Sequence, residues 1–119
     1  MKHATQSGSD TLGDVARLCE EHFRAHRLNI LARVRESDRA MDIALSSTAG
    51  DALIVVRCVV RIDPADYRAL RTMLIQGDFS GAAVVFTAED QPHLSSEIPT
   101  YPLAQVDDLA AFLAGQSAD

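Results

Sequence analysis

Two arginines interrupt the most apolar stretch of the chain, residues 52–61, whose sequence is Ala-Leu-Ile-Val-Val-Arg-Cys-Val-Val-Arg. The stretch is short and rich in β-branched residues, which favours a strand covered on both faces over a helix. Because side chains alternate along a strand, we expect Arg57, Val59 and Arg61 on one face. A charge inside a buried strand costs free energy unless it is paired or reaches a cleft. Arg57 therefore predicts a carboxylate partner or a polar site beside this strand.

Two histidines with helical spacing are a second candidate for chemistry. His22 and His26 lie four residues apart in a predicted helix over residues 11–26, so they share one side of it. This spacing is compatible with a shared metal ion. However, the stretch His-Phe-Arg-Ala-His lacks the glutamate that a zinc protease places beside its first histidine. The other interpretation, which we favour, is two partly exposed helix residues.

The remaining elements follow from periodicity and from turn residues. Strands over residues 28–35 and 41–46 lead through short turns into the central strand and predict an antiparallel meander. Asp63-Pro64 predicts the start of a helix and Gly77 its end. A strand over residues 81–87 then completes a parallel crossover. A short strand over residues 101–106 and a helix that begins at Asp107 or Asp108 and ends before Gly115 close the chain.

The predicted order is αβββαββα, a mixed sheet flanked by helices in an α/β sandwich. We expect residues 1–10 to be a disordered lead-in, residues 11–115 a single domain and residues 116–119 a tail. No apolar run is long enough to span a bilayer, and the N-terminus lacks the apolar core of a signal peptide. Cys19 and Cys58 both lie in apolar surroundings, which favours buried thiols over a disulfide. These features predict a cytoplasmic protein with no membrane association.

The acidic net charge argues against strong nucleic-acid binding. The formal net charge is −6, whereas domains that bind nucleic acid tightly usually have a positive net charge or a stripe of basic residues. All the arginines lie between Arg17 and Arg71, so a basic face on the first two-thirds of the chain is still compatible with the sequence.

The element order and four short motifs resemble the PD-(D/E)xK nuclease core, and within it the Mrr-like restriction endonuclease family. Members of that family have a helix with a glutamate, an Asp-Gly-Gly-hydrophobic-Asp motif and a strand that ends in Gln-Cys-Lys or Glu-x-Lys. A helix, a Phe-Val-Thr-Thr strand and a terminal hydrophobic-Asp-x-x-x-Leu segment follow. The similar segments here are residues 38–43, 56–59, 85–87 and 105–109, in the family's order. The resemblance extends over roughly residues 12–114 and implies a three-layer restriction-endonuclease-like sandwich.

The resemblance also implies where the chemistry would lie. In that family an aspartate and a second acidic or amide residue hold a divalent ion, usually magnesium, and a lysine activates the attacking water. Asp42 matches the aspartate, and Glu20 or Glu21 matches the helix glutamate. Arg57 stands at the second-ligand position, where it would repel a cation, and Val59 stands at the lysine position. We therefore expect a vestigial site in which Asp42 pairs with Arg57, and assign no catalytic residue, metal or cofactor.

Two functions compete on this basis. The leading hypothesis is a catalytically inactive, degenerate nuclease-like domain that serves as a binding or assembly module for a protein or DNA partner. If the partner is DNA, Arg57 and Arg61 are the residues expected to contact it. Formation of a homodimer is also compatible with this hypothesis. The alternative is a divergent Mg²⁺-dependent DNA endonuclease with migrated ligands from Glu20, Asp38 and Asp42. If the resemblance is architectural only, the fold says nothing about function.

Overall fold

The computed structural model describes residues 11–47, 52–88 and 98–118 of the chain. The predicted lead-in, residues 1–10, lies outside the described residues, as do most of the predicted connections over residues 47–51 and 88–100.

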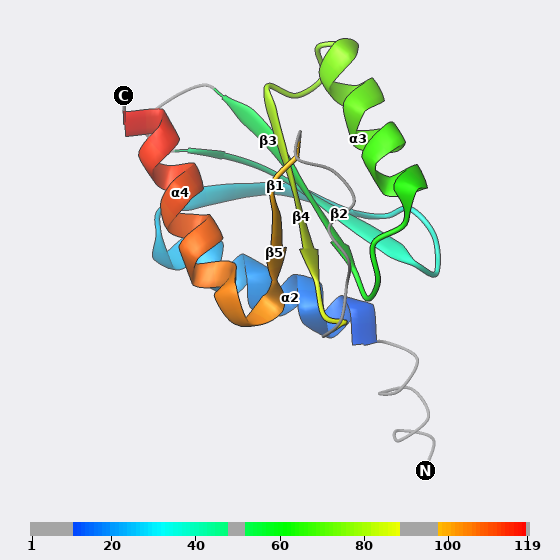
Figure 1. The fold of residues 1–119 in the computed structure, drawn as a ribbon. Helices are drawn as coiled ribbons and strands as arrows, with labels where there is room; N and C mark the ends of the chain where they lie inside the picture. The colour runs from blue at the N-terminus through cyan, green and yellow to red at the C-terminus, as the bar shows by residue number, and fades with distance from the viewer. Residues whose placement is uncertain (1–10, 48–51, 89–97, 119) are drawn as a thin grey trace.

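The described residues form a mixed five-stranded sheet with three helices packed against it (Figure 1). The order αβββαββα and the α/β sandwich are as predicted. The elements are α2 Thr11–Ala25, β1 Leu28–Arg35, β2 Ala40–Ser47, β3 Leu53–Val59, α3 Pro64–Ile75, β4 Gly81–Phe86, β5 Thr100–Pro102, the 3₁₀ turn η1 Leu103–Gln105 and α4 Val106–Ala118.

The strands lie in the sheet in chain order, from β1 at one edge to β5 at the other. Neighbouring strands among the first three are antiparallel. Strand β4 runs parallel to β3, because α3 carries the chain back to the end of the sheet at which β3 begins, and β5 runs parallel to β4. Strand β3 is therefore central, and all of its residues after Leu53 are buried. It ends at Val59, two residues before the predicted end at Arg61.

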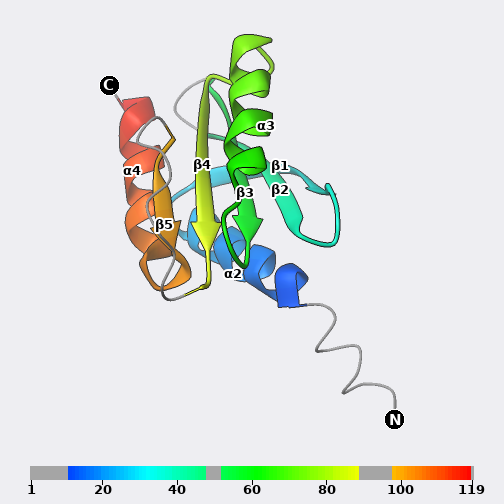
Figure 2. The ribbon, with the colours of Figure 1, turned by 45° about the vertical axis from the view of Figure 1, so that its right-hand side comes forward.

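Helices α2 and α4 cover one face of the sheet, and α3 covers part of the other (Figures 1 and 2). Side-chain alternation along β3 divides the core between the two faces. Ile54, Val56 and Cys58 belong to the cluster with α2 and α4, which we call the first core. Val55 and Val59 belong to the cluster with Tyr67 and Leu70 of α3, which we call the second core.

Helix α3 begins and ends where its flanking residues predict. The Asp63 side chain accepts a hydrogen bond from the backbone N–H of Ala65, and the Asp66 side chain accepts one from the backbone N–H of Asp63. These reciprocal bonds form a capping box, with Pro64 as the first helical residue. Gly77 follows the helix with φ +83°, a left-handed conformation that glycine adopts without strain.

The C-terminal elements differ from the prediction. Strand β5 ends at Pro102, since proline lacks the N–H that would continue a ladder, and a 3₁₀ turn occupies residues 103–105. Helix α4 then passes through Gly115 and reaches Ala118, so the prediction that Gly115 ends it is wrong. A glycine inside a helix costs only about 1 kcal/mol relative to alanine, and none of residues 116–118 is a proline that would interrupt the helix. No helix in the described part of the chain is both long and apolar enough to cross a membrane.

The second core contains one polar atom whose removal should stabilise the protein. The Tyr67 hydroxyl is buried and has no hydrogen-bond partner among the described residues, and burial raises the pKa of this phenol. Tyr67→Phe should raise the free energy of unfolding by about 1 kcal/mol, because it removes an unsatisfied buried hydroxyl and keeps the ring. Urea denaturation of the variant and the wild type would measure this, and a loss of stability would mean that the hydroxyl is hydrogen-bonded after all.

Candidate functional site

The predicted partner of Arg57 lies directly opposite it. In the antiparallel pair of β2 and β3, Asp42 and Arg57 are register partners, so their side chains point to the same face of the sheet. Arg57 Nε donates to Asp42 Oδ1 at 2.8 Å, and Nη2 donates to Oδ2 at 2.9 Å. The contact is a bidentate guanidinium–carboxylate pair, and each residue is only 5% exposed. The predicted Asp42–Arg57 ion pair is confirmed.

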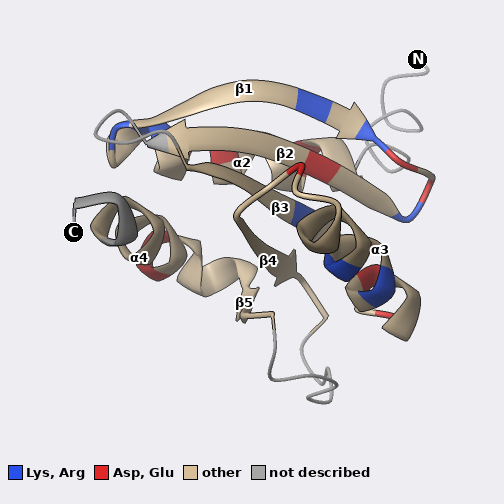
Figure 3. Cartoon of the chain, turned by 90° about the horizontal axis from the view of Figure 1, so that it is seen from above, with Lys and Arg blue, Asp and Glu red and all other residues tan. Residues whose placement is uncertain are grey.

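A second buried carboxylate completes the coordination of Arg57. Asp66, in the first turn of α3, is 2% exposed, and its Oδ1 accepts a bond of 3.3 Å from Arg57 Nη1. Its Oδ2 accepts the capping bond from the Asp63 backbone and lies 3.5 Å from Nη2 of the half-exposed Arg39. We call Asp42, Arg57 and Asp66 the buried triad. In Figure 3 an acidic band of β2 and a basic band of β3 lie side by side, close to α3.

The electrostatics of the buried triad favour the charged form of its arginine. The hydrogen bond from Asp42 raises the pKa of Arg57, the charges of Asp42 and Asp66 add to this effect, and burial opposes it. The guanidinium is therefore a permanent cation clamped between two carboxylates. The three hydrogen bonds that it donates to Asp42 and Asp66 end on carboxylates of buried residues, so it is not displayed to a ligand.

The third vestigial position, Val59, lies in the same layer but contributes no chemistry. It is fully buried, pairs in register with Ala40, and packs in the core beneath α3. A hydrocarbon at this place can neither orient water nor offset phosphate charge.

Glu20, the candidate helix acid, lies on the opposite side of the sheet from Asp42. Glu20 is 3% exposed and accepts two hydrogen bonds from Arg33 of β1, at 2.7 and 2.9 Å. Arg24 lies 3.5 Å from the same carboxylate. Helix α2 packs on the face of the sheet that bears Val56 and Cys58, whereas Asp42 points toward α3. The structure therefore does not bring Glu20 and Asp42 together.

Asp38 and Arg61 also lie apart from the buried triad. Asp38 is exposed in the bend between β1 and β2. Arg61 is exposed in a bend beyond the end of β3 rather than on the strand, so the prediction that it shares a strand face with Arg57 is wrong. Because Arg57 is enclosed by carboxylates, the two arginines do not form a joint basic surface. Among the described residues, no group of three or more His, Cys, Asp or Glu side chains is arranged to hold a metal ion.

His22 and His26 are brought together by a residue that sequence reasoning treated only as a helix cap. His22 Nδ1 lies 3.2 Å and His26 Nε2 lies 2.9 Å from the same oxygen, Oδ1 of Asp107 in the first turn of α4. Both histidines are partly exposed, in agreement with the favoured interpretation. This cluster connects α2 to α4 across the surface of the first core.

This cluster predicts a pH dependence of stability. Hydrogen bonds from His26 and then His22 lower the pKa of Asp107. A carboxylate with a lowered folded-state pKa stabilises the fold above its unfolded-state pKa, about 3.9, and loses that contribution as pH falls through the folded value. Asp107→Asn should therefore lower the melting temperature near neutral pH, and wild type and variant should converge in strong acid, where the Asp107 carboxylate is protonated.

Thermal melts over a pH series would test this, with Asp108→Asn as the matched control. Asp108 is the next residue of the same helix turn and is also exposed, so both changes remove equal charge from the helix N-terminus. Indistinguishable pH profiles for the two variants would show that the histidine contact carries no stability.

The two cysteines are buried free thiols, as predicted. Cys19 of α2 and Cys58 of β3 lie with their sulfur atoms 4.0 Å apart inside the first core. The Cys58–Cys19 contact and burial raise the pKa of Cys58 well above its ordinary value. The thiol is therefore a poor nucleophile.

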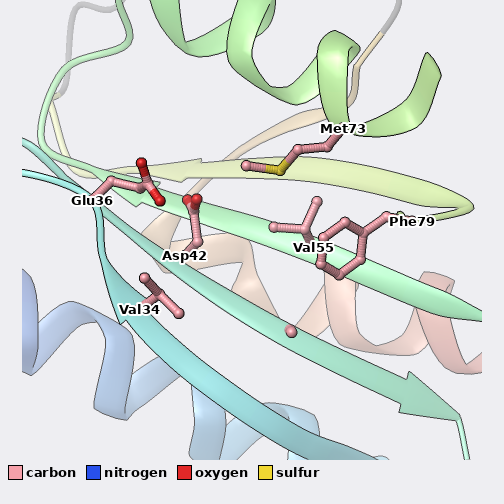
Figure 4. Close-up of a pocket in the computed structure, with 7 residues that line it drawn as sticks. Val34, Glu36, Asp42, Val55, Met73 and Phe79 are labelled. Atoms are coloured by element: carbon pink, nitrogen blue, oxygen red, sulfur yellow. The ribbon is translucent and has the colours of Figure 1, made fainter. Parts of the chain in front are cut away.

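A pocket of about 130 Å³ opens beside the buried triad (Figure 4). Five apolar residues and two acidic ones line it: Val34, Ala44, Val55, Met73, Phe79, Glu36 and Asp42. Of these, only Asp42 was singled out by the sequence. The others come from three strands, a helix and two connections, and no local pattern joins them.

Comparison with known proteins adds no relative. No protein-family model matches the chain, and neither the curated proteins nor the solved structures contain a significant match to it.

Proposed function

We propose that this chain is a catalytically inactive nuclease-like domain that acts as a binding or assembly module. The observation that carries the proposal is the position of the Arg57 guanidinium, which occupies the space between the Asp42 and Asp66 carboxylates. In the nucleases that the sequence resembles, a divalent cation is held by the aspartate that Asp42 matches. Here a covalently attached cation, the Arg57 guanidinium, donates a hydrogen bond to each Asp42 oxygen. The guanidinium can neither bind water as a Lewis acid nor leave the site.

The element order and the hydrocarbon at Val59 support the same proposal. The order αβββαββα is the one expected for the nuclease-like sandwich. The lysine that would assist hydrolysis is replaced by a fully buried valine. What remains is a stable scaffold with a pocket beside the former site, which is a common basis for a binding role.

Calorimetric titration with Mg²⁺ and Mn²⁺ tests the proposal directly. Wild type and Asp42→Ala should both give only heats of dilution, and neither should cleave DNA with either metal present. Because Asp42→Ala also disturbs the buried triad, Asp42→Asn should be titrated in parallel and the folding of each variant checked by circular dichroism. Saturable binding that disappears in both variants, together with metal-dependent cleavage, would establish the alternative, a divergent endonuclease.

We place this module in the cytoplasm. Cys19 and Cys58 are free and close together, which suits a reducing compartment.

A further inference from the structure

The pocket beside the buried triad exists because α3 covers only part of its face of the sheet. Helix α3 packs mainly against β4, and on the same face the described residues leave Val34 of β1 exposed and Ala44 of β2 partly buried. Val34 of β1 is 50% exposed, and partly buried Met73 and Phe79 form the opposite wall. Figure 4 shows Val55 between these walls. Apolar side chains thus surround most of a space that remains unfilled.

One end of this pocket is acidic. Figure 4 shows the carboxylates of Glu36 and Asp42 close to each other at this end, away from Phe79. The Glu36 side chain is exposed and makes no ion pair with any described residue. Both Asp42 oxygens are bonded to Arg57, but a carboxylate has about four lone-pair sites and these bonds use two.

The two buried carboxylates behind this end are paired, and the exposed one is not. Arg57 pairs with Asp42 and Asp66, and Arg39 pairs with Asp66, whereas Glu36 forms no ion pair with another described residue. The Arg57 guanidinium is buried and the Arg39 guanidinium is directed at Asp66. The open end therefore presents negative charge to a ligand, in a chain whose net charge is −6.

We infer that this pocket binds a lysine or arginine side chain of a partner protein, so that the module recognises a basic segment. A cavity of roughly 150 Å³ holds one benzene molecule, so a pocket of about 130 Å³ is sized for a single side chain. The aliphatic stem of a basic residue suits the apolar walls, and its charged head reaches the Glu36 carboxylate. Phosphates and acidic side chains are repelled by the same charge. This inference rests on the proposed binding function and names the chemistry of the partner.

An NMR titration with short peptides tests the inference. The probes are three acetylated and amidated pentapeptides, Gly-Ala-X-Ala-Gly, in which X is lysine, norleucine or glutamate. The lysine peptide should produce saturable shifts at the amides of Val34, Ala44, Val55 and Phe79. Norleucine keeps the stem without the charge and should bind about three- to five-fold more weakly, the usual contribution of one exposed ion pair. The glutamate peptide should leave these amides unmoved.

Two protein variants distinguish the contribution of the Glu36 charge from that of the pocket volume. Glu36→Gln removes one exposed charge at no expected cost to folding, and it should make the lysine and norleucine peptides bind equally. Ala44→Leu fills the partly buried floor of the pocket and should abolish binding of both. Glu21→Gln, an exposed change on α2 across the sheet, is the control and should leave all affinities as in wild type.

Three results would overturn the inference. They are an absence of pocket shifts with the lysine peptide, equal binding of lysine and norleucine by wild type, and unchanged selectivity in Glu36→Gln. If light scattering shows a homodimer that Ala44→Leu dissociates, a second copy of the chain occupies the pocket instead. None of these results alters the metal titration, so failure of this inference is distinguishable from failure of the inactive-nuclease proposal.

Discussion

Replacing Arg57 with alanine is expected to lower the free energy of unfolding by about 3–5 kcal/mol. The substitution leaves two buried carboxylates, Asp42 on β2 and Asp66 in the first turn of α3, without the cation that lies between them in the wild type. Two like charges in a low-dielectric interior repel each other, and each has also lost hydrogen bonds that replaced water. Since small domains are stable by only about 5–15 kcal/mol, this change removes a large part of the total.

Denaturant unfolding of the alanine variant measures this loss. Arg68→Ala is the matched control, because Arg68 lies on the exposed side of α3, and its removal should change stability by no more than about 0.5 kcal/mol. If the alanine variant does not fold, Arg57→Lys gives the same information, because lysine keeps the charge but loses the bidentate fork and should be intermediate. Equal stability of wild type and Arg57→Ala would refute the buried triad.

The prediction of the Asp42–Arg57 pair had two sources. A charge in an apolar strand must be compensated, which singled out Arg57, and the resemblance placed Asp42 at the same site. The structure supplies the physical reason for the contact, because Asp42 and Arg57 are register partners and their side chains therefore lie on one face of the sheet. Local rules predicted both ends of α3, because its capping residues act within a few positions of each other.

The role of Asp66 was missed although the sequence contains a signal for it. Asp66, Leu70 and Met73 share the helical spacing of one face, so an acid on the stripe that includes buried Leu70 should have been matched with Arg57. A first-turn aspartate is usually explained by capping alone, whereas Asp66 both caps the helix and pairs with Arg57.

Other features could not be predicted from one sequence. The resemblance matched Glu20 to the helix acid of a site that includes Asp42, whereas the structure places the two on opposite sides of the sheet. Periodicity could not correct this, because it shows which face of a helix is buried but not which side of the sheet the helix covers. Asp107 meets His22 and His26 across more than eighty residues, through packing alone. The pocket likewise depends on how far α3 extends over β1 and β2.

The double substitution Asp42→Leu with Arg57→Met is expected to recover most of the stability that Arg57→Met alone loses, leaving the protein within about 1–2 kcal/mol of wild type. Burying an ion pair costs solvation free energy that is about as large as the attraction between the two charges. Leucine and methionine fill similar volumes, and their burial is favourable because it removes apolar surface from water. Asp66 keeps the Asp63 backbone N–H and Arg39 as partners in the double variant. A double-mutant cycle in urea, with both single variants, measures the coupling.

The outcome decides why the pair is present. If the double variant is stable, charge at this position is not needed for folding, and its presence is explained by descent from a site that once held a cation or by the acidic end of the pocket. The peptide titration on the same variant then separates these two, because loss of lysine selectivity would assign the Asp42 carboxylate to binding. If the double variant is as unstable as Arg57→Met, the hydrogen bonds of the buried triad are themselves required to join α3 to the sheet, and the pair is structural.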